Sequence, residues 1–308
     1  MRRFVSAFLL LALLLALTGC GAPAPRGEEK LLVVASAFPS YDLVRAVAGD
    51  LVELKLLLKP GAEPHSYEPS PQDILAVEQC DLFLYGGGES DVWLDRVLSS
   101  GGSAQRRVIR LMDCAEVCTA EHDHEAHEHD HEEAYDEHVW TSPMNALRIM
   151  EAIVEQLAEL DGAHADVYRE NARLWEEKLL ELDGEFRSVA AEGRRKLLVF
   201  GDRFPFLYFT REYGLEYLSA YPGCSDAAEV DPATLAELID RVEELEIPIV
   251  FRCDLSAGKV ADTISEATGA RVETLYSCHT LSKADFEAGE SYLSLMTRNL
   301  NVIREALN

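Results

Sequence analysis

The chain has 308 residues, 48% of them hydrophobic, which is enough apolar material to bury two lobes of ordinary domain size. Aspartate and glutamate number 55 against 28 lysines and arginines, so the formal net charge is −27 at pH 7. Such a charge repels nucleic acid and anionic membrane surfaces and attracts cations. The composition therefore excludes nucleic acid as a partner and favours a neutral or positively charged one.

The first twenty residues, MRRFVSAFLLLALLLALTGC, carry two arginines ahead of an apolar run from Phe4 to Leu17. This run is too short and wrongly flanked for a transmembrane helix and is typical of an export signal. Its end, LTGC, resembles the lipobox at which bacterial lipoproteins are cleaved and acylated. We predict a lipoprotein signal peptide at 1–19, lipidation of Cys20 and a tether at 20–29, which would anchor the chain to the outside of the bacterial cell membrane.

The next part of the chain alternates between strand and helix patterns. Strand-like runs at 31–36, 52–58 and 81–85 are separated by helical patterns at 41–48 and 71–80. Such alternation predicts a parallel sheet with crossover helices. We assign 30–160 to an N-terminal α/β lobe.

Within this lobe, residues 121–134 read EHDHEAHEHDHEEA. The segment has almost no apolar residues to bury, so we predict a mobile loop. It could be a solubilising insert or a weak collector of divalent cations beside the main site. Its histidines favour the collector, because charge alone needs no imidazole.

A long helical pattern without proline extends from about Asp166 to Val189. A helix of roughly 24 residues would span about 36 Å, long enough to join two lobes. We assign 161–193 to this connecting helix and 194–308 to a C-terminal lobe, where strand-like runs recur at 196–200, 216–220, 248–252 and 271–276. The predicted fold class is α/β, with two lobes, each a parallel sheet flanked by helices, joined by one long helix.

Residues of the types that bind metals occupy the loops after these strands. The first lobe offers His65, and the second offers Asp202, Cys224, Cys253-Asp254 and Cys278-His279. A loop histidine taken alone is more often merely exposed, and an extracellular cysteine pair is more often a disulfide. Because ligands of open α/β sheets bind at the carboxyl ends of the strands, the collective pattern favours one site in a cleft between the lobes.

Four segments resemble a known family: PGAEPHSYEPSPQDI around His65, DEHVWTSPMNA around His138, REYGLEY at 211–217 and GESYLSLMTRNL at 289–300. With the lipobox, they resemble the metal-binding lipoproteins of bacterial ABC importers for zinc and manganese, the cluster A-I solute-binding proteins. The resemblance covers essentially all of the mature chain. It implies a monomeric binding protein, not an enzyme, that holds one divalent ion between two lobes and hands it to an ABC transporter permease.

The resemblance also implies ligands. His65 and His138 match the two histidines that the first lobe supplies. A third histidine or a glutamate usually follows the first strand of the second lobe, and the matching position is Gly201, which has no donor atom. The fourth position corresponds to Glu290.

The absence of a donor at Gly201 leaves four candidates for the ligands from the second lobe: His279, Asp202, Cys224 and Glu290. We favour His279, because imidazole suits zinc and its loop follows a buried strand. The predicted metal ligands are thus His65, His138, His279 and Asp202, although Asp202 could instead cap a helix or pair with Arg203.

The remaining cysteines fit an oxidising compartment. Cys224 and Cys278 could close a disulfide, which we favour over thiolate ligation. Cys114 and Cys118 are close enough in sequence to pair locally. Cys80 and Cys253 are interpreted as buried small residues or unpaired thiols.

Nitrogen ligands favour zinc over calcium or magnesium, which prefer oxygen cages. Manganese is the alternative, as the weaker binder at such a site, but a histidine-rich loop in this family marks zinc-type members.

Two other classes of protein are alternatives to a binding protein of an importer. An extracytoplasmic zinc hydrolase could use Glu63 or Glu68 as a base, but no helix-borne HExxH pair appears, because the one match, HEHDH at 127–131, falls in the predicted loop. A metal-buffering surface adhesin would explain the lipobox and histidines but not paired histidines in a two-lobed fold.

Overall fold

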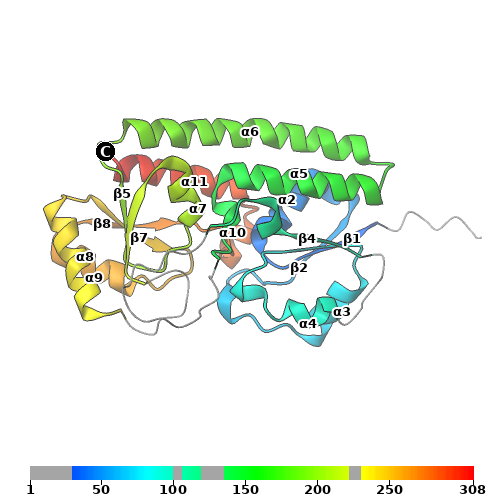
Figure 1. The fold of residues 1–308 in the computed structure, drawn as a ribbon, viewed down its shortest axis with the longest axis horizontal. Coiled ribbons are helices and arrows are strands. Elements are labelled where there is room, and N and C mark those ends of the chain that lie inside the picture. Colours follow the sequence, from blue (N-terminus) through cyan, green and yellow to red (C-terminus); the bar gives the residue numbers. More distant parts are fainter. Residues whose placement is uncertain (1–29, 100–105, 119–134, 222–229) are drawn as a thin grey trace, which may run out of the picture. The chain divides into compact units, whose positions relative to one another are not determined.

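The computed structural model describes residues 30–99, 106–118, 135–221 and 230–308 (Figure 1), of which 31–308 form one compact unit. The predicted signal peptide, Cys20, the tether, the loop at 121–134 and Cys224 lie outside the described residues. Among the helices that are described, none has the length and apolar character needed to cross a membrane.

The first sheet is parallel, with strand order β2-β1-β3-β4. Its central strands are apolar on both faces, as expected where helices cover both sides. Val33 and Leu84 face a core shared with α2 and α5, whereas Val34 and Phe83 face a smaller core with α3 and α4. The elements are β1 (Leu32–Ala35), α2 (Phe38–Ala48), η1 (Gly49–Leu51), β2 (Glu53–Leu56), η2 (Pro64–Ser66), α3 (Pro71–Gln79), β3 (Leu82–Tyr85), η3 (Glu89–Asp91), α4 (Leu94–Ser99), β4 (Arg107–Arg110), η4 (Leu111–Cys114), η5 (Val139–Thr141) and α5 (Pro143–Leu160).

The second sheet repeats the arrangement, with parallel order β6-β5-β7-β8. Val199 and Val250 face the layer of α8 and α9, while Phe200 and Phe251 face the opposite layer. The elements are β5 (Leu197–Phe200), α7 (Leu207–Tyr213), β6 (Glu216–Ser219), α8 (Pro232–Glu244), β7 (Ile249–Cys253), α9 (Lys259–Thr268), β8 (Arg271–Leu275), α10 (Lys283–Glu287) and α11 (Tyr292–Ala306).

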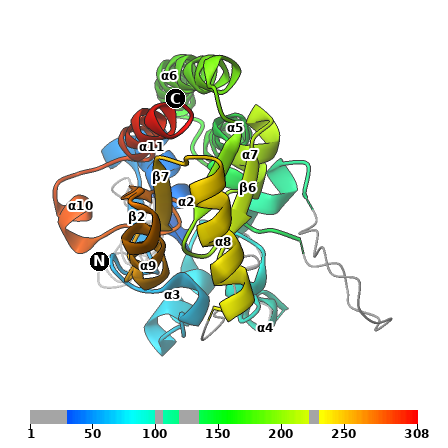
Figure 2. The same ribbon diagram turned by 90° about the vertical axis from the view of Figure 1, so that its left-hand side faces the viewer.

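The two lobes are joined by α6 (Ala165–Glu192), a helix of 28 residues. Figures 1 and 2 show it running beside α5 of the first lobe and α11 of the second. Its buried face, with Leu179, Leu182 and Phe186, belongs to a single core that contains residues of both lobes. The predicted fold class is confirmed, and the shared core restrains the lobes relative to each other.

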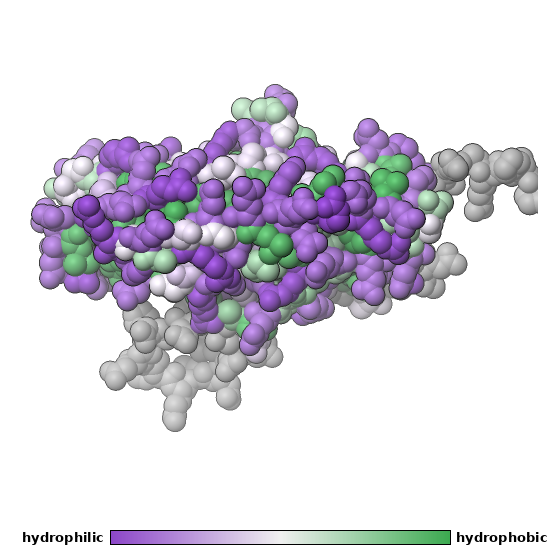
Figure 3. Space-filling view, turned by 90° about the horizontal axis from the view of Figure 1, so that it is seen from above, coloured by the Kyte–Doolittle hydropathy of each residue, from purple (hydrophilic) through white to green (hydrophobic). Residues whose placement is uncertain are grey.

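The outer side of α6 faces solvent, where Val167, Leu174 and Leu180 are exposed among charged residues. Figure 3 shows this face covered mostly by hydrophilic residues, with small apolar areas between them. Isolated apolar side chains of this kind are ordinary on a protein surface.

Candidate metal site between the two lobes

Three histidines from three loops meet between the lobes. His65 follows β2, His138 precedes α5, and His279 follows β8. Their ring centroids are 5.8 Å (His65 to His138), 5.5 Å (His65 to His279) and 5.2 Å (His138 to His279) apart. One nitrogen of each ring and one carboxylate oxygen of Glu137 all lie within 4.8 Å of one another. Donors around a tetrahedral zinc ion at about 2.0–2.1 Å lie about 3.4 Å apart, so small movements would let this cluster bind an ion.

His65 is oriented through a serine. Its Nδ1 lies 2.9 Å from Ser90 Oγ, which also donates to Glu137 Oε1 at 2.5 Å. Since the hydroxyl has one hydrogen and gives it to the carboxylate, Ser90 Oγ accepts a hydrogen bond from His65 Nδ1–H. This tautomer leaves a lone pair on His65 Nε2 for a metal. The other oxygen of Glu137 accepts from Ser90 N at 3.1 Å, so both carboxylate oxygens are engaged.

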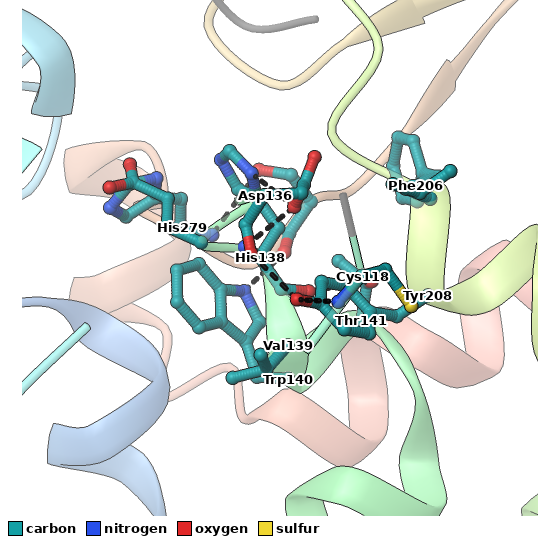
Figure 4. Close-up of polar contacts among 12 residues, drawn as sticks. Cys118, Asp136, His138, Val139, Trp140, Thr141, Phe206, Tyr208 and His279 are labelled. Atoms are coloured by element: carbon teal, nitrogen blue, oxygen red, sulfur yellow. Dashed lines mark hydrogen bonds and ion pairs between the residues drawn. The ribbon is translucent and has the colours of Figure 1, made fainter. Parts of the chain in front are cut away.

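His138 is buried and held by Asp136 (Figure 4). Asp136 Oδ1 accepts hydrogen bonds from the backbone N–H of His138 at 2.8 Å and from its Nδ1 at 3.1 Å. The segment that follows is fixed by α5, whose N-cap is Ser142. A carboxylate behind a histidine is the usual arrangement for a metal ligand, because it fixes the ring and presents Nε2.

His279 is also buried, and its Nδ1 makes no hydrogen bond with any described residue. Its backbone N–H donates to Ser277 Oγ at 3.2 Å, and its carbonyl accepts from Phe38 N, across the lobes, at 3.3 Å. Its ring packs edge-on against Trp140, with centroids 4.9 Å apart. A buried ring nitrogen without a partner is costly, and a metal ion would relieve that cost.

The surroundings favour neutral imidazoles. Burial, and then His138 nearby, lower the pKa of His65. Burial lowers the pKa of His279 well below its ordinary value, with further contributions from His138, His65 and Arg203. Metal binding requires the deprotonated ring, so these shifts keep ligands available at neutral pH.

The lowered pKa values predict a pH-dependent stability of the metal-free protein. An unfolded histidine binds a proton near pH 6.5, whereas His65 and His279 resist protonation in the folded state. The unfolded chain therefore binds more protons, and the histidine contribution to stability is lost as the pH falls below about 6.5.

Three carboxyls oppose this trend, because burial raises the pKa of Asp42 and raises the pKa of Asp91 and of Asp254 to about 6. The comparison that isolates the histidines is between the wild type and the double variant His65→Ala, His279→Ala, by urea denaturation at pH 7.5 and 5.5 without metal. We expect the wild type to lose more stability than the variant, and equal losses would contradict the prediction.

Asp202, predicted as a ligand, lies outside the donor cluster. Its Oδ1 accepts from Arg203 N at 2.8 Å and its Oδ2 from Cys253 N at 3.1 Å. Both oxygens thus satisfy backbone amides between β5 and β7. Its placement fits a structural role and not the ligand role.

Position 201 does not face the histidines either. A Cβ on Gly201 would lie 2.4 Å from Cα of Ala261, so the glycine allows α9 to pack closely against β5. Arg203 and Pro205 of this loop do line the cavity, and Arg203 donates to both carboxylate oxygens of Glu63 at 3.1 and 3.0 Å. A guanidinium has no acceptor and cannot bind a metal. The loop that supplies a ligand in the resemblance therefore supplies an interlobe ion pair here.

Glu290 and Cys224 are the remaining candidate ligands. The carboxylate of Glu290 pairs with Arg298 and accepts from Ser294 Oγ, and it is not part of the donor cluster. Cys224 lies outside the described residues.

The predicted disulfides are not formed in this structure. Cys114 and Cys118 are free thiols, and the thiol of Cys114 is directed to Arg110 O at 3.7 Å. Cys278 is a free, buried thiol directed to Tyr276 O, so its predicted bond to Cys224 is absent, and burial raises the pKa of Cys278. Cys80 is buried and donates to Val77 O, in line with its interpretation as a core residue.

Two residues near the cluster were missed as functional candidates. Glu137 precedes His138 in DEHVW, so its position beside a ligand was visible in the sequence. Asp254, in the loop after β7, lines the same cavity as the three histidines. The contacts of Glu137 and Asp254 identify them as functional candidates, and no local sequence pattern predicts those contacts.

Two parallel α/β lobes joined by a long helix, with buried histidines between them, define a metal-binding solute-binding protein. The chain belongs to the family described as ZnuA, zinc-uptake complex component A periplasmic, whose model matches residues 33–306. The family resemblance found in the sequence is confirmed.

Individual relatives support the same family assignment. The chain is 30% identical to the high-affinity zinc uptake system protein ZnuA of Bacillus subtilis, over 99% of this chain and 98% of that protein. It is also 30% identical to the zinc-binding lipoprotein AdcA of Streptococcus pneumoniae over 91% of this chain, but it spans only 56% of AdcA. The crystal structure of the Zn(II)-bound ZnuA-like domain of that AdcA superimposes with a TM-score of 0.76 at 27% identity, covering 90% of this chain and 99% of the domain.

Proposed function

We propose that this protein binds one zinc ion between its lobes through His65, His138 and His279 and delivers it to the permease of an ABC importer. The observation that carries the proposal is the convergence of three imidazoles, of which His138 and His279 are buried and His65 is half-buried, on one point. Membership of a zinc-uptake family supports the same conclusion. Zinc is the cargo, and the site has no further chemistry to perform.

The donor set favours zinc. Three nitrogen donors suit zinc, whereas calcium and magnesium require several oxygen ligands. Glu137 is the carboxylate in the cluster, and both of its oxygens are engaged by Ser90. Manganese would bind the same nitrogens more weakly.

We also propose that the protein is not an enzyme. A hydrolase needs a general base close to the metal-bound water. Neither carboxylate that the sequence suggested as a base is placed for this role, because Glu63 is paired with Arg203 and Glu68 is exposed and does not line the cavity. The site is built to hold an ion. An acylated Cys20 and a monomeric state outside the cytoplasm complete the proposal.

Metal titration of the full chain tests this function. We expect one tightly bound zinc ion by calorimetry and several weak ones, with manganese binding the tight site more weakly than zinc. A variant lacking residues 121–134 is the control, and it should lose weak ions and keep the tight one. A tight site that disappears with this segment, or a preference for manganese, would contradict the proposal. Zinc uptake by cells with and without the protein then tests delivery.

A further inference from the structure

Asp254 has a buried carboxylate oxygen without a partner. It lies in the turn after β7, where its Oδ1 accepts from Ser277 N at 2.7 Å. Its Oδ2 is buried and makes no hydrogen bond with any described residue. The residue lines the cavity that also contains His65, His138 and His279. A carboxylate oxygen buried in this way is costly unless a donor or a cation meets it.

The other carboxylates around the cavity already have partners. Glu63 pairs with Arg203, Asp136 with His138, and Glu137 with Ser90. Among the described residues, Asp254 forms no ion pair with an arginine or a lysine. Of these four carboxylates, it is the one with a buried oxygen that has no partner among the described residues.

Asp254 is held firmly in this position. Ser277, which donates to Asp254, also accepts from the backbone of His279 through its Oγ at 3.2 Å and from Trp140 Nε1 through its carbonyl at 2.9 Å. One residue thus positions the carboxylate, a histidine of the cluster and the tryptophan that packs on that histidine. Asp254 is fixed relative to the cluster.

Three histidines leave one position open around a tetrahedral ion. Glu137 cannot take it without releasing Ser90, which orients His65. Asp254 is not among the donors that lie within 4.8 Å of one another, so its oxygen is placed for an indirect contact. The cavity measures about 30 Å³, and a water molecule needs about 10–15 Å³.

We propose that a water molecule fills the fourth position on the metal and donates a hydrogen bond to Asp254 Oδ2. The carboxylate then completes the site from the second lobe and offsets part of the charge of the ion. This inference rests on the proposed zinc binding and adds a positioning residue that lies neither at Gly201 nor at Glu290.

The test is Asp254→Asn in the full chain, with Asp202→Asn as the matched control. Both residues follow strands of the second sheet, but Asp202 has two amide partners and does not line the cavity. We expect D254N to lower zinc affinity about 10- to 100-fold, as loss of such outer partners does, and D202N to change it less than about 3-fold. Affinity is measured by competition with a chelating indicator.

Stability separates this role from a structural one. Without metal at pH 7, D254N should melt no lower than the wild type, because the variant removes a buried charge, whereas D202N should melt lower. In a zinc-bound crystal structure, a water should lie between the ion and Asp254 Oδ2. Unchanged zinc affinity in D254N, or an Asp254 oxygen bound directly to zinc, would overturn the inference. Failure of the wild type to bind zinc tightly would instead overturn the proposed function.

Discussion

Replacing His279 by alanine is expected to lower zinc affinity by about 100-fold or more. Binding of structural zinc by four ligands is worth about 10–16 kcal/mol, so one ligand contributes about 3 kcal/mol, which is about 100-fold in affinity. Among the described residues of the second lobe, His279 is the one that gives a donor to the cluster. Its loss would leave the ion bound by the first lobe alone. Competition against a chelating indicator at pH 7.5 measures the effect.

The matched control is His164→Ala. This histidine precedes α6, is partly exposed, pairs with Asp161 at 2.7 Å and is not part of the cluster. The His164→Ala variant removes an imidazole that is not part of the site, so its zinc affinity should equal that of the wild type. If H279A retained wild-type affinity while His65→Ala lost it, the ligand from the second lobe would have to be a different residue.

The positions of the loops were predictable from the sequence, but the directions of their side chains were not. Strand patterns placed His65, Asp202, Asp254 and His279 after parallel strands, and parallel strands bring their carboxyl ends to one edge of a sheet. Asp202 and Arg203 are neighbours in one loop, yet only Arg203 lines the cavity. Close packing of Gly201 against Ala261 fixes which of them does so. That contact joins segments sixty residues apart in the sequence, so no local pattern predicts it.

The residues that support the histidines were hidden for the same reason. Ser90 reaches Glu137 and His65 from another loop, and Ser277 reaches Asp254 from the loop after the neighbouring strand. Strand and helix periodicity reports which face of an element is buried, but it does not report hydrogen-bond partners from distant loops. The core that extends through both lobes was likewise not visible in patterns read one segment at a time.

Trp140 is expected to be the residue whose loss most affects both stability and the site. It is 1% exposed, its Nε1 donates to Ser277 O at 2.9 Å, and its carbonyl accepts from Tyr292 OH at 2.7 Å. These bonds tie the segment before α5, in the first lobe, to the second lobe. Replacing a buried tryptophan by alanine costs about 3–5 kcal/mol. We therefore expect Trp140→Ala to lower the free energy of unfolding by about that amount, measured by urea denaturation followed by far-ultraviolet circular dichroism.

Zinc binding should fall in the same variant, because the indole ring packs against His138 and His279, with centroids 5.4 and 4.9 Å away. Trp140→Phe is the control, since it keeps an aromatic ring in contact with both histidines and removes the bond to Ser277 O. It should cost about 1–3 kcal/mol for the unpaired carbonyl and retain most of the zinc affinity. If Trp140→Ala lost stability but bound zinc like the wild type, the histidines would be held by Asp136 and Ser90 without the ring. A loss of affinity in the alanine variant alone would instead mean that the second lobe's ligand depends on a side chain of the first.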